Sequence, residues 1–226
     1  MNQKTAIVLG GTGLTGNLLI NRLLADDSYA RIKLFSRKAS GIKSEKIEEF
    51  IGDLFQLEHF KEDFTADEVF CCIGTTSAKT RDRVVYKAID FGIPSTAARL
   101  ARENNIPTFL VISSMGANTR SSIFYSRTKG EMEQAVLGEK IPHTYILQPS
   151  LIMGNRDERR MGESVGAALL KFTNVVLVGR LKKYRAIEAD CIAAAMIHLA
   201  LSKPPSGIVI SDKLQELGFG EVEVLN

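Results

Sequence analysis

Cysteine is scarce in this 226-residue chain, which has only three, too few to form a complete set of disulfides. Cys71 and Cys72 are adjacent inside an apolar run, where they would point to opposite faces of a strand. No cation near them in sequence would stabilise a thiolate, and their spacing from other potential ligands does not match a metal site. Both are therefore expected to be core residues. The sequence therefore indicates a reducing compartment.

Long hydrophobic runs are also missing. The longest, Cys191–Leu201, contains His198 and is well short of the roughly 20 residues that span a bilayer. The N-terminus passes from Met1–Lys4 directly into Thr5–Leu9, a pattern that is neither a signal peptide nor a transit sequence. We therefore expect a soluble protein with no membrane partner and a cytoplasmic location.

An excess of charge of one sign is absent as well. Lysine and arginine total 29 against 26 acidic residues, so the net charge of +3 lacks the concentrated basic excess of nonspecific nucleic-acid binding. The histidines, at positions 59, 143 and 198, are scattered and indicate no metal site. A small-molecule substrate is the expected partner, and the sequence leaves monomer and homodimer both open.

No linker, repeat or low-complexity tract divides the chain, and its length favours one domain over residues 1–226. Short β-branched runs alternate with amphipathic segments, which predicts an α/β fold with a doubly wound parallel sheet. The expected strands are Ala6–Leu9, Ile32–Phe35, Lys46–Ile51, Glu68–Ile73, Thr108–Ser113, Thr144–Leu147 and Gly207–Ser211. The expected helices are Leu14–Ala25, Leu54–Lys61, Ser95–Asn105, Arg127–Leu137, Glu163–Phe172 and a segment capped by Asp190 that ends at Leu201. Residues 148–226 are too few for a second domain and are expected to form a small extension on the substrate side.

The most informative motif is a glycine-rich turn between the first strand and the first helix, Gly10-Gly11-Thr12-Gly13-Leu14-Thr15-Gly16. Glycine permits a tight turn and a close approach of the backbone to a pyrophosphate, which the free N–H groups of the helix N-terminus then bind. The alternative is an ordinary glycine-rich turn. The position of the motif between a strand and a helix predicts dinucleotide binding by Gly10, Thr12, Gly13, Leu14, Thr15 and Gly16.

The second strand ends in Phe35-Ser36-Arg37-Lys38, and no acidic residue lies between Ile32 and Ile42. A site that prefers NAD places an acid here to accept a hydrogen bond from the ribose 2′-hydroxyl. The Arg37 guanidinium can instead pair with a 2′-phosphate, to which Ser36 adds a hydroxyl. NADP(H) is therefore favoured over NAD(H), although a solvated basic turn remains the alternative.

Two further strand ends carry candidate cofactor contacts. Asp53, followed by Leu54, can accept from an adenine amino group or can cap the next helix. Ile73 and Gly74 end the fourth strand, where the glycine suits the close approach of a flat ligand to the backbone.

The catalytic candidates are Tyr125 and Lys129, which follow the pair Ser113 and Ser114 at the end of the fifth strand. Tyrosine and lysine four residues apart share a helix face, where the ammonium group can lower the pKa of the phenol from about 10. One of the two serines would hold a carbonyl oxygen. A surface pair is the alternative for the tyrosine and lysine.

These motifs resemble the short-chain dehydrogenase/reductase superfamily, in its atypical short members. The segments Cys72–Thr76, Ser113–Ala117, Tyr125–Glu131 and Gln148–Ser150 are similar to the Tat-interacting oxidoreductase-like branch. The resemblance implies a Rossmann fold, NADP(H), and a Ser, Tyr, Lys active site. It also implies that Pro149 and Ser150 lie beside the nicotinamide and that Lys129 contacts its ribose.

The chain departs from the related nucleotide-sugar epimerases at two positions. Gln148 stands where they commonly have arginine, and Asp90 stands where they have a helical asparagine. A nucleotide-sugar substrate is therefore not assumed, although an epimerase-like enzyme stays an alternative.

Arg156, Arg159 and Arg160 can hold an anionic substrate group or form a solvated loop.

The residues support two functions of different classes. The first is an NADP(H)-dependent oxidoreductase acting on a small carbonyl or alcohol. The second is a dinucleotide-binding sensor or scaffold without turnover, which would share every cofactor residue with the enzyme.

Overall fold

The computed structural model describes residues 3–76, 78–154 and 179–219. Its centre is a seven-stranded sheet in the order β3-β2-β1-β4-β5-β6-β9, in which each neighbouring pair is parallel. The strands are β1 Lys4–Leu9, β2 Tyr29–Ser36, β3 Ile47–Ile51, β4 Glu68–Cys71, β5 Thr108–Ile112, β6 His143–Gln148 and β9 Gly207–Ile210. The Rossmann-type fold expected from the sequence is confirmed.

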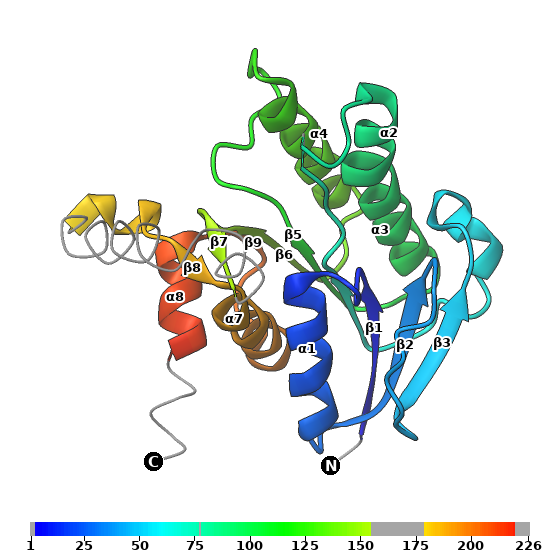
Figure 1. Cartoon of the computed structure of the whole chain (residues 1–226). Coiled ribbons are helices and arrows are strands. Elements are labelled where there is room, and N and C mark those ends of the chain that lie inside the picture. Colours follow the sequence, from blue (N-terminus) through cyan, green and yellow to red (C-terminus); the bar gives the residue numbers. More distant parts are fainter. Residues whose placement is uncertain (1–2, 77, 155–178, 220–226) are drawn as a thin grey trace.

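Helices cover both faces of the sheet (Figure 1). One layer packs against a core that includes Leu19 of α1 and Ile192 of α7, and the other packs against a core that includes Leu100 of α3 and Val136 of α4. The first layer contains α1 Leu14–Ala25, α7 Ala189–Ser202 and α8 Ser211–Phe219. The second contains the 3-10 segment η1 Leu54–Phe60, α2 Arg83–Lys87, the π-helical turn η2 Ala88–Gly92, α3 Ile93–Glu103 and α4 Phe124–Gly138.

The continuous apolar strands follow from this two-sided burial. In β1, Ala6 and Val8 face the core under α1, whereas Ile7 and Leu9 face the core under α3, and all four are fully buried. A strand covered on both faces has no polar side to present to water. Polar groups are therefore left mainly to the ends of the strands.

Three predicted helices differ from the structure: the one expected at Leu54–Lys61 is the 3-10 segment η1, and two others begin earlier than expected. The helix expected at Ser95–Asn105 begins earlier, because α2, η2 and α3 follow one another from Arg83 to Glu103. Gly92 and Pro94 weaken the helical pattern in the sequence, yet Pro94 lies in the first turn of α3, where its missing N–H costs little. The helix expected at Arg127–Leu137 begins at Phe124, which adds Tyr125 to it.

The sequence predicted Asp190 as the N-cap of α7, and this prediction is wrong. Glu188 occupies the N-cap position, and Asp190 lies in the first turn of the helix. Its two carboxylate oxygens accept from the Arg22 guanidinium of α1, both at 2.8 Å. This contact joins helices 168 residues apart in the chain.

A small second sheet follows β6. It pairs β7, Ile152–Met153, with β8, Ile187–Glu188, in parallel, and the 3-10 segment η3, Gly179–Tyr184, precedes β8. The helix expected at Glu163–Phe172 and the cluster of Arg156, Arg159 and Arg160 lie outside the described residues. Within those residues, no helix has the length and hydropathy to cross a bilayer, and no group of side chains could hold a metal ion.

Native thiols should react slowly with alkylating reagents. Burial raises the pKa of Cys71 and of Cys191 to about 11, and it raises the pKa of Cys72 as well. At pH 8 these groups stay protonated, and thiolate is the reactive form. We expect iodoacetamide to label the native protein about 100-fold more slowly than the urea-unfolded chain. Equal rates for any one of the three cysteines would contradict this burial.

Candidate functional site

The carboxyl ends of β1, β4 and β5 meet at one edge of the sheet, where ligands bind in doubly wound folds. The glycine turn after β1 lies against the end of β4. Gly10 has a φ of +81°, and a Cβ atom there would lie 2.7 Å from the carbonyl group of Cys72. At Gly16, a Cβ atom would collide with the Gly10 carbonyl, so α1 can approach the turn only with glycine at that position.

The N-terminus of α1 is open. Its N-cap, Gly13, offers no side-chain cap, and no acidic residue lies in the first turn. A Cβ atom on Gly13 would meet only the Gly10 carbonyl oxygen, at 3.1 Å, among the described residues. A helix N-terminus without a side-chain cap has free N–H groups, which fit a pyrophosphate.

The other residues of the turn divide between exposure and packing. Thr12 is exposed and Thr15 is buried. Leu14 contacts the segment after β7, since a Cβ atom on Gly154 would lie 2.8 Å from a Leu14 methyl group. Leu14 thus links the turn to the segment that was predicted to carry the substrate side.

The residues after β2 include two exposed cations, Arg37 and Lys38. Arg37 is exposed and makes no hydrogen bond or ion pair with the described residues. Ser36 is buried, and its hydroxyl donates to the Lys38 carbonyl oxygen at 2.6 Å. The Ser36 hydroxyl therefore stabilises the turn after β2, and the Arg37 guanidinium group stays available to a phosphate.

At the end of β3, the second of the two roles considered for Asp53 is the one observed. Its carboxylate caps η1 by accepting from the Phe55 N–H at 3.0 Å, and Leu54 is only 5% exposed. At the end of β4, Ile73 is half-buried and Gly74 is exposed. A Cβ atom on Gly74 would lie 3.7 Å from the Lys129 ammonium nitrogen.

A buried ion pair lies beside Gly74. Lys129 Nζ is 2.8 Å from Asp90 Oδ1 and donates to the Ile112 carbonyl oxygen at 3.3 Å, and the other Asp90 oxygen accepts from the Thr75 N–H at 2.8 Å. The side chains of Asp90 and Lys129 are 0% and 4% exposed. Asp90 lies in the π-helical turn η2, a distortion that often marks functional sites.

Sequence reasoning noted Asp90 only as a departure from relatives. Asp90 lies between the apolar residues Ile89 and Phe91, in a helix that packs on a core. This position indicated that its carboxylate is buried and needs a partner. Its partner could not be identified without the fold.

Tyr125 lies one helical turn before Lys129 on α4. The Tyr125 ring is half-buried and packs edge-on against Tyr86, with 6.3 Å between the ring centroids. Burial, followed by the Asp90 carboxylate, raises the pKa of Tyr86, so its phenol stays neutral. The Tyr125 hydroxyl makes no hydrogen bond within the described residues, which leaves it available to a ligand.

The two serines after β5 have different surroundings. The Ser113 hydroxyl donates to the Glu133 carboxylate, which also accepts from the Gln148 amide at 2.9 and 3.1 Å. The Ser114 hydroxyl is buried and has no partner among the described residues. A buried hydroxyl without a partner requires explanation, and a bound ligand would supply one. Of the two serines, Ser114 is therefore the one whose hydroxyl has no partner among the described residues.

Pro149 and Ser150 join the end of β6 to its surroundings. The Pro149 carbonyl oxygen accepts from the Met115 N–H at 3.0 Å, which places it beside the segment after β5. The Ser150 hydroxyl donates to the Arg185 carbonyl oxygen and accepts from the Ser211 hydroxyl at 3.0 Å. The Ser150 hydroxyl thus uses both its donor and its acceptor to join the end of β6 to Arg185 and to the start of α8.

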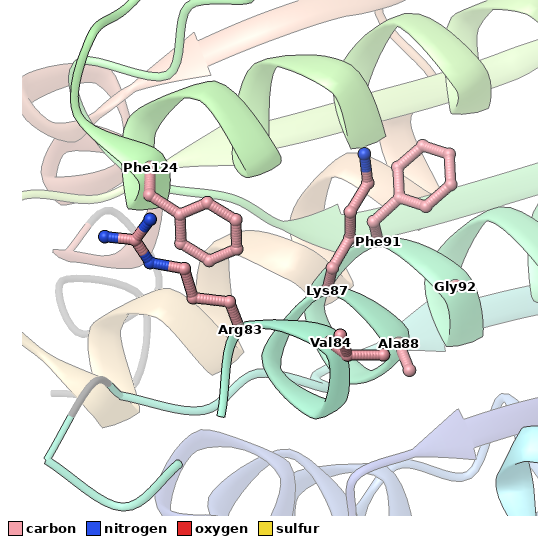
Figure 2. A pocket seen from close by; sticks show the side chains of 7 residues that line it. All are labelled: Arg83, Val84, Lys87, Ala88, Phe91, Gly92 and Phe124. Atoms are coloured by element: carbon pink, nitrogen blue, oxygen red, sulfur yellow. The ribbon is translucent and has the colours of Figure 1, made fainter. Parts of the chain in front are cut away.

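A separate hollow of about 430 Å³ lies on the outer side of α2 and η2, against Phe124 of α4. Figure 2 shows its lining, in which Arg83 lies over the Phe124 ring and Lys87 lies beside Phe91. None of the site residues described above lines it.

Comparison with known proteins agrees with this geometry. An NAD(P)H-binding family model matches residues 10–168. Protein fmp52-1, mitochondrial, of Aspergillus terreus is 32% identical over 232 residues, with 97% of each chain covered. Protein HTATIP2 of Rattus norvegicus is 30% identical over 168 residues, with 72% of this chain and 69% of the relative covered.

Among solved structures, ADP-L-glycero-D-manno-heptose-6-epimerase of Helicobacter pylori superposes with a TM-score of 0.68 at 14% identity. The match covers 98% of this chain and 83% of the epimerase. At this identity the likeness concerns the fold alone.

The comparison corrects the expected cytoplasmic location. Seven fungal relatives are named as mitochondrial proteins, which contradicts that expectation. Free cysteines indicate a reducing environment, and this property does not distinguish the cytoplasm from other reducing compartments.

The family match covers more than half of the chain, and the similarity to protein HTATIP2 agrees with the resemblance inferred from the sequence motifs. With its Rossmann-type sheet and open glycine turn, this chain belongs to the NAD(P)H-binding family of atypical short-chain dehydrogenases/reductases.

Proposed function

We propose that this protein is an NADP(H)-dependent oxidoreductase that moves hydride between its cofactor and a small carbonyl or alcohol. The observation that carries the proposal is the free, buried hydroxyl of Ser114 at the same sheet edge as Tyr125 and Lys129. A hydroxyl for the carbonyl oxygen, a phenol and an ammonium group are the parts that such a reaction requires.

Each residue has a distinct role in the proposed reaction. The open N-terminus of α1 binds the pyrophosphate, and Lys129, held by Asp90, contacts the nicotinamide ribose. The cofactor supplies or accepts hydride when bound. The Ser114 hydroxyl donates to the carbonyl oxygen of the substrate, and Tyr125 transfers a proton to that oxygen during reduction or removes one during oxidation.

The preference for NADP(H) rests on Arg37. It is an exposed cation directly after β2, and no acidic residue lies in residues 32–42 to bind a ribose 2′-hydroxyl. A planar guanidinium group binds phosphate through two parallel hydrogen bonds.

Replacing Arg37 should abolish this preference. Wild-type protein should bind NADPH more tightly than NADH, and Arg37→Ala should weaken NADPH binding about 10- to 100-fold while NADH binding changes little. Isothermal titration measures both affinities. Arg31→Ala serves as the control, because Arg31 lies near the opposite end of β2, where it pairs with Glu48 at 3.7 Å. Equal or tighter binding of NADH by the wild type would contradict the assignment.

The two serines should separate chemistry from stability. Ser114→Ala should lower turnover about 100-fold, as loss of a hydrogen-bond donor to a developing oxyanion does, with cofactor affinity unchanged. Ser113→Ala removes a donor from the buried Glu133 carboxylate and should cost about 1 to 3 kcal/mol of stability, measured by urea unfolding. A larger loss of turnover in the Ser113 variant than in the Ser114 variant would reverse the assignment.

Tyr125→Phe tests the proton transfer. It should leave NADPH affinity nearly unchanged and reduce turnover at least 100-fold, the lower range for general acid–base catalysis. A panel of aldehydes, ketones and quinones with NADPH provides the assay. Tyr145→Phe is the matched control, because its hydroxyl donates to the Pro204 carbonyl oxygen and its ring is fully buried in the core. Wild-type turnover by the Tyr125 variant would contradict the role, and NADPH binding without turnover of any substrate would favour a sensor.

A further inference from the structure

The Asp90–Lys129 pair places two opposite charges, with almost no contact with water, at the edge of the sheet where we propose that the cofactor binds. Gly74, which is exposed, lies directly against the pair, since a Cβ atom there would lie 3.6 Å from Asp90 Oδ1 and 3.7 Å from Lys129 Nζ. Both side chains are anchored to backbone at strand ends, Asp90 to the Thr75 N–H and Lys129 to the Ile112 carbonyl oxygen. Their positions are therefore fixed relative to any ligand at this edge.

Stability alone does not explain this pair. Removing two charges from water costs several kcal/mol for each ion, and well-packed apolar residues often serve equally well in the same place. An uncharged amide at position 90 could also accept the Thr75 hydrogen bond. What the carboxylate adds is one negative charge next to Lys129.

That charge affects the two forms of a nicotinamide cofactor differently. The oxidised nicotinamide ring carries one positive charge, and the reduced ring is neutral. An unpaired ammonium group nearby would repel the oxidised ring in a site shielded from water, and the Asp90 carboxylate cancels that repulsion. The other buried acid on this side, Glu133, is occupied by Ser113 and Gln148 and sits one turn beyond Lys129.

We propose that Asp90 sets the relative affinity of the protein for oxidised and reduced cofactor, and so biases the direction of hydride transfer. This inference rests on the cofactor position given in the proposed function. It concerns binding, so it can be tested without knowledge of the substrate.

The test measures the dissociation constants of NADP⁺ and NADPH by isothermal titration and compares their ratio among variants. Asp90→Asn should raise the ratio of the NADP⁺ constant to the NADPH constant at least fivefold, which is about 20 mV in the potential of the bound two-electron couple. Lys129→Met should lower the ratio. The double variant, which restores a neutral pair, should return it to within about twofold of wild type.

A structural role for Asp90 predicts a different result, because misplacing Lys129 weakens a ribose contact that both cofactor forms share. The two constants would then rise together and the ratio would stay constant. Glu131→Gln is the matched control: it removes an acid that pairs with Lys87 across α2 and α4 on the exposed side, so the ratio should not change. Figure 2 shows Lys87 in the lining of the separate hollow, beside Phe91.

Each outcome separates the inference from the proposed function. If wild-type protein binds neither NADP⁺ nor NADPH, the proposed function is wrong and the inference fails with it. If both forms bind and the ratio is the same in wild type, Asp90→Asn and Lys129→Met, only the inference is overturned. Should Asp90→Asn fail to fold, the other two variants still decide the question. The ratio should be lower than wild type in Lys129→Met and close to wild type in the double variant.

Discussion

The two-sided burial of the parallel sheet is the constraint on which the rest of the structure depends. Strands such as β1 have a core on each face, so polar side chains are confined mainly to strand ends and loops. Because the strands are parallel, their carboxyl ends share one edge. Gly10, Gly74 and Ser114, which are far apart in the chain, therefore lie at the same edge of the sheet, and the Lys129 ammonium group reaches this edge from α4.

Patterns local in sequence predicted most of this fold. The run Ala6–Leu9, the turn from Gly10 to Gly16 and the leucine stripe of α1 each depend on neighbouring residues, so they can be read without tertiary information. The start of α2 was missed because Gly92 and Pro94 interrupt the helical pattern, although tertiary packing continues the helix through them. Asp190 was taken for a cap because its partner, Arg22, is distant in the sequence.

The site shows the same division between local and distant information. The spacing of Tyr125 and Lys129 predicted a shared helix face, although the helix expected from the sequence began only at Arg127. Choosing between Ser113 and Ser114 required Glu133 and Gln148. The buried contact with Asp90 likewise could not be read from spacing, because it joins α4 to the π-helical turn. The Asp90 carboxylate both positions Lys129 and balances its positive charge. In the proposed function, the π-helical turn that carries Asp90 therefore determines the net charge beside the cofactor.

A crystal structure of the protein with bound NADPH would test the cofactor site most directly. We predict that the pyrophosphate lies on the N–H groups between Gly10 and Gly16, and that Lys129 contacts the nicotinamide ribose while keeping its pair with Asp90. The Ser114 and Tyr125 hydroxyls should face the same side of the nicotinamide ring. A dinucleotide bound away from the glycine turn, or a nicotinamide ring remote from Lys129 and Ser114, would contradict the assignment.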